Sequence, residues 1–290
     1  MSAIYRSATG AQEIARRYTE ALGAWPVAAE HHHIPTHVGE TFVVASGPIG
    51  APPLVLLHGS GANTTAWRDD VESWSRHFRT YAVDLVGEPG RSAPTRPPLD
   101  SDACASWLDA VLDEEGIGNA ALLGMSLGAW TALDYAIRRP ERVTRLALLC
   151  PGGIGRQKVG WIPRALLLRL FGRRGIRRSA ATVTGLHGRE YRQLLDEVAL
   201  TFTQFRPRTR LPVFGDEALR GVRVPVQVTV GDSDVLFDSA GTARRVRECI
   251  PHADVMTLPG VGHAVFGRTE PLLEFLLEDS RPGGDQDAGL

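Results

Sequence analysis

The stretch from Gly124 to Gly128 constrains this chain more than any other part of its sequence. It reads Gly-Met-Ser-Leu-Gly, follows an apolar run at 120–123 and precedes a helix-like pattern through Ile137. A serine in a sharp strand-to-helix turn holds its hydroxyl out of the backbone, where a base and a carbonyl can reach it. The two glycines permit this turn because side chains there would clash with the neighbouring strand and helix. Because so short a pattern also occurs by chance, its interpretation depends on the rest of the chain.

The sequence around this turn alternates between strand-like and helix-like segments. Residues 53–57 are nearly all apolar, as expected for a strand that is buried on both faces. Strands that alternate with helices predict a parallel sheet covered by helices on both sides. The predicted strands are 41–45, 53–57, 80–85, 120–125, 143–150, 224–230 and 254–258, and the predicted helices are 11–22, 102–115, 127–138, 240–250 and 271–277.

The composition indicates an ordinary globular protein, with 43% hydrophobic and 22% charged residues. A length of 290 residues allows one large domain or two small ones. No apolar run is long enough to span a membrane, and the first residues lack the apolar segment of a secretory signal, so we expect neither. Cys104, Cys150 and Cys249 are odd in number and widely spaced. This favours free thiols in a reducing cytoplasm, with no metal-binding spacing.

Four chemistry-bearing loops follow predicted strands, at the edge where open α/β sheets place their functional groups. Loop 58–61, His-Gly-Ser-Gly, offers backbone N–H groups that could face an oxyanion. Ser126 follows the strand 120–125, and loop 231–234 carries two carboxylates. Loop 259–263 ends in a histidine. The sequence therefore predicts a nucleophile, an acid and a base in the chain order Ser, Asp, His at one edge of the sheet.

Together with Asp-Leu-Val-Gly-Glu-Pro-Gly-Arg-Ser at 84–92, these loops resemble the α/β-hydrolase superfamily over roughly residues 35 to 278. The N-terminal helix and the Gly-Glu-Pro-Gly turn are similar to a branch of bacterial carboxylesterases. The resemblance implies an α/β-hydrolase fold, a mostly parallel sheet flanked by helices with a helical cap insertion. It divides the chain into an N-terminal helix and lead-in (1–34), a core (35–151 and 220–279) and a cap (152–219). Residues 280–290 are rich in Gly and Asp, so we expect a disordered tail there.

The resemblance also implies a role for each loop. The imidazole of His263 would take the proton of Ser126 during attack, because a serine hydroxyl is otherwise a poor nucleophile. Asp234 would hold the imidazole and stabilise its charge, with Asp232 as the less favoured alternative. The backbone N–H groups of Ser60 and Leu127 would bind the oxyanion. A serine at this turn, where dehalogenases and epoxide hydrolases carry an aspartate, argues against both.

Other polar residues near these loops have a structural interpretation. We expect His58 to support its own loop by hydrogen bonding, and Asp84, Gly90 and Ser92 to hold a tight turn. The three histidines 31–33 precede a strand, in an expected loop without partner carboxylates, so we interpret them as surface residues rather than metal ligands. Trp67 and Trp130 are expected to pack in the core near the site.

Residues 152–219 differ in charge from the rest of the chain. They hold 13 Lys and Arg against 5 Asp and Glu, whereas the remainder holds 19 against 28. The segment from Trp161 to Phe171 is strongly apolar and is followed by four arginines. We expect a cap helix that buries its apolar face over the pocket and leaves the arginines in solvent. An arginine-lined entrance for anionic substrates and peripheral attachment to anionic lipid are the alternatives. Nucleic-acid binding is not favoured.

The expected function is hydrolysis of a carboxylic ester of a small molecule through an acyl-enzyme, without a cofactor or a metal. The alternatives are other reactions of the same triad, carried out by thioesterases, perhydrolases, C–C hydrolases and lyases, and a non-catalytic receptor for small molecules. The sequence leaves the oligomeric state open.

Overall fold

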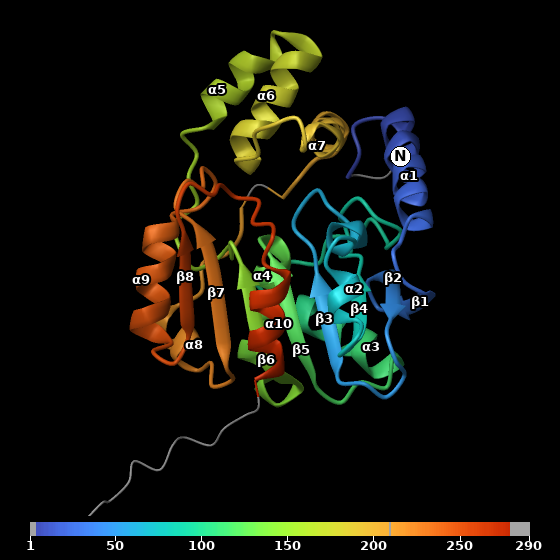
Figure 1. Ribbon diagram of the computed structural model, residues 1–290, viewed down its shortest axis with the longest axis vertical. Coiled ribbons are helices and arrows are strands. Elements are labelled where there is room, and N and C mark those ends of the chain that lie inside the picture. The colour runs from blue at the N-terminus through green and yellow to red at the C-terminus, as the bar shows by residue number, and fades with distance from the viewer. Residues whose placement is uncertain (1–3, 209, 279–290) are drawn as a thin grey trace, which may run out of the picture.

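A computed structural model describes residues 4–208 and 210–278 of the protein, so the predicted disordered tail lies outside the described residues. At its centre is an eight-stranded sheet with the spatial order β1-β2-β4-β3-β5-β6-β7-β8 (Figure 1). The strands are β1 (Ala29–Thr36), β2 (Gly39–Ser46), β3 (Pro53–Leu57), β4 (Arg79–Val83), β5 (Ala120–Met125), β6 (Val143–Leu149), β7 (Val226–Gly231) and β8 (Asp254–Leu258). β1, β2 and β4 pair in antiparallel fashion, and all pairs from β4 to β8 are parallel.

Helices cover both faces of this sheet, as the alternating sequence pattern predicts. Val55 and Leu57 of β3 belong to the core under α3, α4, α8 and α9. Leu54 and Leu56 belong to the opposite core, under α1, α2 and α10. The helices are α1 (Ala8–Gly23), α2 (Val71–Trp74), α3 (Ala103–Glu114), α4 (Leu127–Arg138), α5 (Ile162–Arg169), α6 (Gly172–Thr184), α7 (Arg192–Gln204), α8 (Asp216–Arg220), α9 (Ser239–Cys249) and α10 (Thr269–Leu277), with 3₁₀ turns at Thr64–Trp67 and Pro140–Arg142. The predicted α/β class is confirmed.

The edge strand β1 corrects one sequence prediction. The histidines 31–33 lie within this strand and not in a loop, because backbone pairing with β2 fixes a segment whose side chains show no strand pattern. Carboxylates are also present beside them. His32 Nδ1 lies 2.6 Å from Glu115 Oε1, and His33 Nδ1 lies 2.8 Å from Glu40 Oε1. His31 and His33 both pack against the ring of Phe42. All three histidines thus make contacts within the fold.

Helices α5, α6 and α7 lie between β6 and β7 in the chain, and Figure 1 shows them above the carboxyl ends of the strands. Backbone hydrogen bonds attach the base of this group of helices to the core. Lys158 N donates to Leu236 O at 2.7 Å, and Ala264 N donates to Thr184 O at 2.9 Å. On the α7 side, Arg206 N donates to Ile4 O at 2.9 Å. The N-terminal segment therefore runs beside the end of α7 and joins it to the body of the protein.

The outermost helix, α5, contradicts the prediction for its apolar segment. Leu166, Leu167 and Leu170 are exposed, at 57%, 59% and 80% of their surface, and α5 contains no buried residue. On the side that faces α6, Ala165 and Leu168, with Trp161 just before the helix, line a small gap between the two helices. Its larger apolar face therefore does not cover the pocket, because only this narrow side of the helix meets another element.

Candidate active site

The turn between β5 and α4 holds Ser126 in a strained backbone conformation. Its φ of 55° and ψ of −107° lie outside the regions that ordinary residues occupy. A Cβ on Gly124 would strike the carbonyl of Gly128, and a Cβ on Gly128 would strike the carbonyl of Leu57. The backbone N–H of Ser126 donates to Leu149 O of β6 at 2.8 Å. The two glycines and the neighbouring strands thus fix a turn that exposes the serine hydroxyl, as their spacing predicts.

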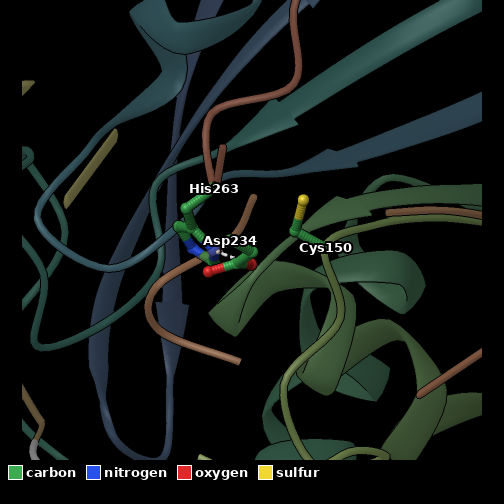
Figure 2. Close-up of side chains that lie close together, drawn as sticks. All are labelled: Cys150, Asp234 and His263. Atoms are coloured by element: carbon green, nitrogen blue, oxygen red, sulfur yellow. Dashed lines mark hydrogen bonds and ion pairs between the residues drawn. The ribbon is translucent and has the colours of Figure 1, made fainter. Parts of the chain in front are cut away.

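The predicted nucleophile, base and acid meet at this turn. His263 Nε2 lies 2.9 Å from Ser126 Oγ, and His263 Nδ1 lies 2.7 Å from Asp234 Oδ2. Figure 2 shows the imidazole and the carboxylate side by side. Because a carboxylate only accepts, Nδ1 carries the proton and Nε2 is free to accept from the serine hydroxyl. Ser126, His263 and Asp234 therefore form a continuous chain of hydrogen bonds.

Asp234 is held by the loop in which it lies. Its side chain is 1% exposed, and its Oδ1 accepts from the backbone N–H groups of Leu236 and Phe237 at 2.6 and 3.1 Å. Asp232, the alternative carboxylate, is exposed and accepts instead from Gly260 N at 2.8 Å. Only one of the two aspartates therefore lies against the imidazole.

The loop after β3 lies directly against the nucleophile, since a Cβ on Gly59 would be 3.5 Å from the Cβ of Ser126. Among the hydrogen bonds of the described residues, the N–H groups of Ser60 and Leu127 have no protein acceptor. Both donors are thus available to a bound group.

Glu88 supports this loop from behind, a role that the sequence pattern did not reveal. Its Oε2 accepts from the Ser60 hydroxyl at 2.9 Å and from Gly61 N at 2.7 Å, while its Oε1 is buried without a partner among the described residues. Burial raises the pKa of this carboxyl to about 7, against the two hydrogen bonds, which lower it. The signal was present in the Gly-Glu-Pro-Gly turn, which places one carboxylate among apolar and turn residues.

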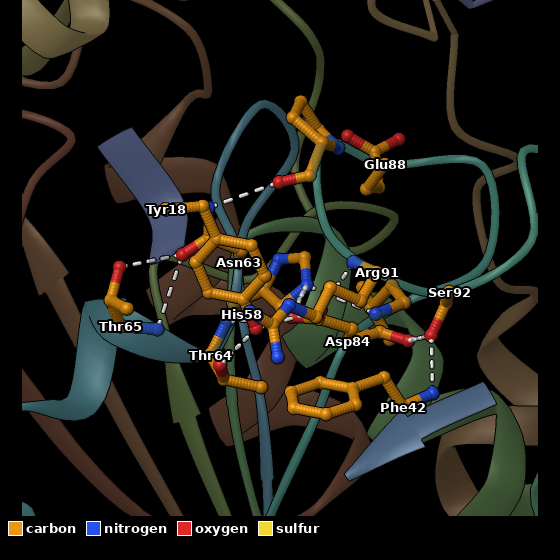
Figure 3. Close-up of polar contacts among 12 residues, drawn as sticks. Tyr18, Phe42, His58, Asn63, Thr64, Thr65, Asp84, Glu88, Arg91 and Ser92 are labelled. Carbon is orange, nitrogen blue, oxygen red and sulfur yellow. Dashed lines mark hydrogen bonds and ion pairs between the residues drawn. The ribbon is translucent and has the colours of Figure 1, made fainter. Parts of the chain in front are cut away.

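His58 and Asp84 stabilise the neighbouring turns, as expected (Figure 3). Leu85 N donates to His58 Nε2 at 3.0 Å, so the other ring nitrogen is protonated and donates to Gly59 O at 2.8 Å. Complete burial lowers the pKa of His58 to about 4, which keeps the ring neutral. This histidine holds its loop in place and does not contact the serine.

Asp84 accepts from four surrounding groups. Thr64 N donates to Oδ1 at 2.9 Å, and Tyr18 OH and Arg91 N donate to Oδ2 at 2.8 and 2.7 Å. The Ser92 hydroxyl donates to the carbonyl of the same aspartate at 2.6 Å. A Cβ on residue 90 would strike the Asp84 carboxylate, so the turn requires a glycine there. The structural interpretation of Asp84, Gly90 and Ser92 is confirmed.

Cys150 lies beside the acid and the base, which the sequence analysis did not anticipate (Figure 2). Its Sγ lies within 4.8 Å of ligand atoms of Asp234 and His263, and its φ is 43°. Burial, with Asp234 nearby, raises the pKa of this thiol to about 12. The imidazole Nδ1 and the carboxylate are already bonded to each other. A neutral thiol next to an occupied pair acts as packing. The sequence feature that could have predicted this contact is the position of Cys150 at the end of β6, which pairs with β7.

Phe237 and the connection between α6 and α7 lie against His263 and the loop that carries it. The ring of Phe237 lies 5.3 Å from the imidazole of His263. A Cβ on Gly185 would come within 2.5 Å of the Cα of Gly262, so the connection and the histidine loop are in backbone contact. The predicted core positions of Trp67 and Trp130 are confirmed, since each is 1% exposed.

A serine at a strained strand-to-helix turn, bonded to a histidine and an aspartate at later strand ends of a mostly parallel sheet, is the arrangement of serine hydrolases with this fold. The sequence profile of the Alpha/beta hydrolase family matches residues 54–275. The chain belongs to this family.

Its relatives narrow the class. The chain is 31% identical over 261 residues to the uncharacterized carboxylesterase nap of Bacillus subtilis (strain 168), covering 86% of this chain and 85% of that protein. It is 30% identical over 259 residues to carboxylesterase YbfK of the same strain, covering 85% and 86%. Among solved structures, carboxylesterase CesB (YbfK) from Bacillus subtilis matches with a TM-score of 0.81 and 26% identity over 93% of this chain and 99% of that one. The naproxen esterase (carboxylesterase NP) from Bacillus subtilis matches with a TM-score of 0.77 and 28% identity, over 92% and 97%. The expected carboxylesterase-like class is confirmed.

Proposed function

We propose that the protein hydrolyses a small-molecule carboxylic ester at Ser126, with His263 as general base and Asp234 as the carboxylate that orients it. The observation that carries this proposal is the unbroken line of hydrogen bonds from the serine through the imidazole to the buried carboxylate. The backbone N–H groups of Ser60 and Leu127 are proposed to bind the oxyanion of the tetrahedral intermediate.

Each step of the reaction follows from these contacts. As Ser126 Oγ attacks the ester carbonyl, its proton passes to His263 Nε2, which then delivers it to the leaving alcohol. Water enters in place of the alcohol, gives a proton to the same nitrogen and attacks the acyl carbonyl. The bond between Ser126 Oγ and the acyl carbon then breaks, the carboxylic acid leaves, and Nε2 returns the proton to Ser126 Oγ. The carboxylate of Asp234 stays ionised and stabilises the imidazolium at each stage. His263 Nε2 takes part in every one of these proton transfers.

We further propose that residues 152–219 act as a cap over this site and that the protein works in the cytoplasm. Support for the location is that Cys104, Cys150 and Cys249 are all buried and unpaired. Within the described residues, none of the helices has the length and apolarity that crossing a bilayer requires.

The proposal is tested with p-nitrophenyl esters of increasing acyl length and with a fluorophosphonate probe. We expect turnover and stoichiometric labelling of the wild type, and a loss of at least about 10⁴-fold in kcat/KM for Ser126→Ala. Ser233 is an exposed serine in loop 231–234, here called the acid loop. Ser233→Ala serves as the control and should retain activity and labelling. An inert wild type across the whole series, without labelling, would instead support a non-catalytic receptor.

A further inference from the structure

The outward face of α5 has a composition that its place in the fold does not explain. Exposed large apolar side chains recur at helical spacing along and beside it, and α5 contains no buried residue. These residues are Val159, Ile162, Leu166, Leu167, Leu170 and Phe171, here called the α5 apolar face. A soluble protein seldom exposes so many large apolar side chains together unless they meet a partner or a membrane.

The α5 apolar face is not left over from packing within the cap. The opposite side of the helix, with Trp161, Ala165 and Leu168, faces Ser179 and Val183 of α6 across a small gap. The two helices touch at the backbone, since a Cβ on residue 175 would strike the carbonyl of Leu168. The outward face thus remains exposed while the cap is fully assembled. Figure 1 shows α5 and α6 at the end of the molecule, farthest from the sheet.

Charge identifies what this face could meet. No acidic residue occurs between Glu141 and Glu190, whereas nine Lys and Arg residues lie between 152 and 189. The helical spacing of 3.6 residues per turn places Arg164 on one flank of the α5 apolar face and Arg169 on the other. Both are exposed. An apolar stripe bordered by cations is the pattern of helices that lie in the interface of an anionic bilayer.

More cations extend this surface onto the start of α6. Arg173, Arg174 and Arg178 are exposed and have no carboxylate partner among the ion pairs of the described residues, whereas Arg177 pairs with Asp196. Contact between two copies through this face would bring the same unpaired cations together. An anionic lipid surface instead neutralises them while its acyl region receives the leucines.

We propose that the α5 apolar face and its flanking arginines form a peripheral membrane-docking surface for bilayers rich in anionic phospholipid. The helix lies in the headgroup region with Leu166, Leu167, Leu170 and Phe171 directed into the acyl boundary. The hydrolase core stays outside the bilayer, and the acid and histidine loops at the base of the cap are not displaced.

The test is co-sedimentation of the full-length protein with vesicles of phosphatidylcholine alone and of phosphatidylcholine with phosphatidylglycerol at 3:1, in 0.1 M and 0.5 M NaCl. We expect binding to the anionic vesicles at low salt, and weaker binding at high salt and to the neutral vesicles. Leu167→Glu with Leu170→Glu, and separately Arg173→Glu with Arg174→Glu, should each lower the partition coefficient roughly tenfold or more.

Matched variants separate the surface from general changes in hydropathy and charge. Ile49→Glu changes an apolar residue that is 86% exposed on another part of the chain, and Arg76→Glu with Arg244→Glu gives the same change in net charge. Both should bind like the wild type. We expect ester hydrolysis and thermal unfolding to be unchanged in all variants. These two measurements show whether a loss of binding comes from misfolding.

Three results would overturn the proposal. The first is no binding to either vesicle at 0.1 M NaCl. The second is binding that the α5 and arginine variants leave intact. The third is a protein that does not bind vesicles but forms a concentration-dependent dimer in sedimentation velocity, which the leucine variant abolishes. The α5 apolar face would then join two copies of the protein. Because the readout is partitioning, failure of the esterase proposal would leave this test unaffected.

Discussion

Asp232 and Asp234 stand two positions apart in one turn, yet only Asp234 reaches the imidazole. Family position favoured Asp234, but the choice depends on which way each side chain points, and a turn sequence does not encode that direction. The backbone N–H groups of Leu236 and Phe237 settle it by holding Oδ1. A matched pair of variants therefore separates catalysis from turn stability.

Asp234→Asn should lower kcat by on the order of 10³–10⁴-fold, because an amide facing Nδ1 favours the tautomer that cannot accept the serine proton. Asp232→Asn should stay within a few-fold of the wild type, because its remaining Oδ1 can still accept from Gly260 N. Steady-state kinetics on a p-nitrophenyl ester measure both. Equal losses in the two variants would contradict the assignment.

Glu88 makes stability depend on pH. Burial raises its pKa from 4.5 to about 7 in the folded protein. Folding therefore takes up a proton between these values, so this carboxyl's contribution to stability is present below pH 4.5 and is lost as the pH rises through 7. Glu88→Gln cannot titrate. From pH 5 to 8 its free energy of unfolding should fall less than that of the wild type, by on the order of 1–3 kcal/mol.

Urea unfolding at pH 5, 6, 7 and 8 measures this difference. The buried Asp84, whose pKa burial raises to about 6, contributes a similar decline in both proteins and cancels in the comparison. Glu248→Gln, an exposed carboxyl, should follow the wild-type curve. Parallel curves for the wild type and Glu88→Gln would show that Glu88 is already ionised in the folded state.

At the scale of elements, the strand ends and the helices that flank the sheet were predictable, whereas the edge strand β1 and the direction of the α5 apolar face were not. Apolar runs such as 53–57 and 120–125 define buried parallel strands, and the chemistry after each follows from topology. β1 was missed because its stability comes from pairing with β2, which local composition does not show. The predicted direction of the α5 apolar face was wrong. An amphipathic pattern distinguishes the two sides of a helix but does not show which side packs against the rest of the protein.

The contact between the α6–α7 connection and the histidine loop predicts a second-site effect on catalysis. Gly185 has a φ of 77°, and an added Cβ would come within 2.5 Å of Gly262 Cα. Gly185→Ala should shift the loop that carries His263 and lower kcat/KM by roughly 10–100-fold, since small misplacements of a base are costly. Gly160→Ala, where nothing lies within 4 Å of the added Cβ, is the control. Unchanged activity in both would mean that the loop is positioned independently of the connection between α6 and α7.

In the whole molecule, the phenol of Tyr18 joins α1 to the turns beneath the site. Tyr18 OH donates to Asp84 Oδ2 at 2.8 Å and lies 2.6 Å from Thr64 Oγ (Figure 3). Tyr18→Phe leaves a buried carboxylate with one donor fewer, which should cost about 1–3 kcal/mol of unfolding free energy. The loss should be larger at pH 8 than at pH 5, because the Tyr18 hydrogen bond lowers the pKa of Asp84 and so favours its ionised form.

Chemical denaturation at the two pH values checks this expectation, with Tyr191→Phe as the control on the half-buried cap surface. Turnover should change little in either variant, since neither phenol contacts Ser126 or His263. A loss that is the same at both pH values would indicate packing rather than support of the charge.

Lys158, the single lysine of the chain, donates from Nζ to the carbonyl of Asp234 at 2.9 Å and is otherwise exposed. Arginine supplies every other basic side chain except histidine, so an amine-directed reagent has one side-chain target, and it lies where the cap segment meets the acid loop. An environment-sensitive dye attached there would report on this junction without an engineered cysteine. The biased basic composition of the protein thus provides a natural labelling site for following the cap during turnover or on vesicles.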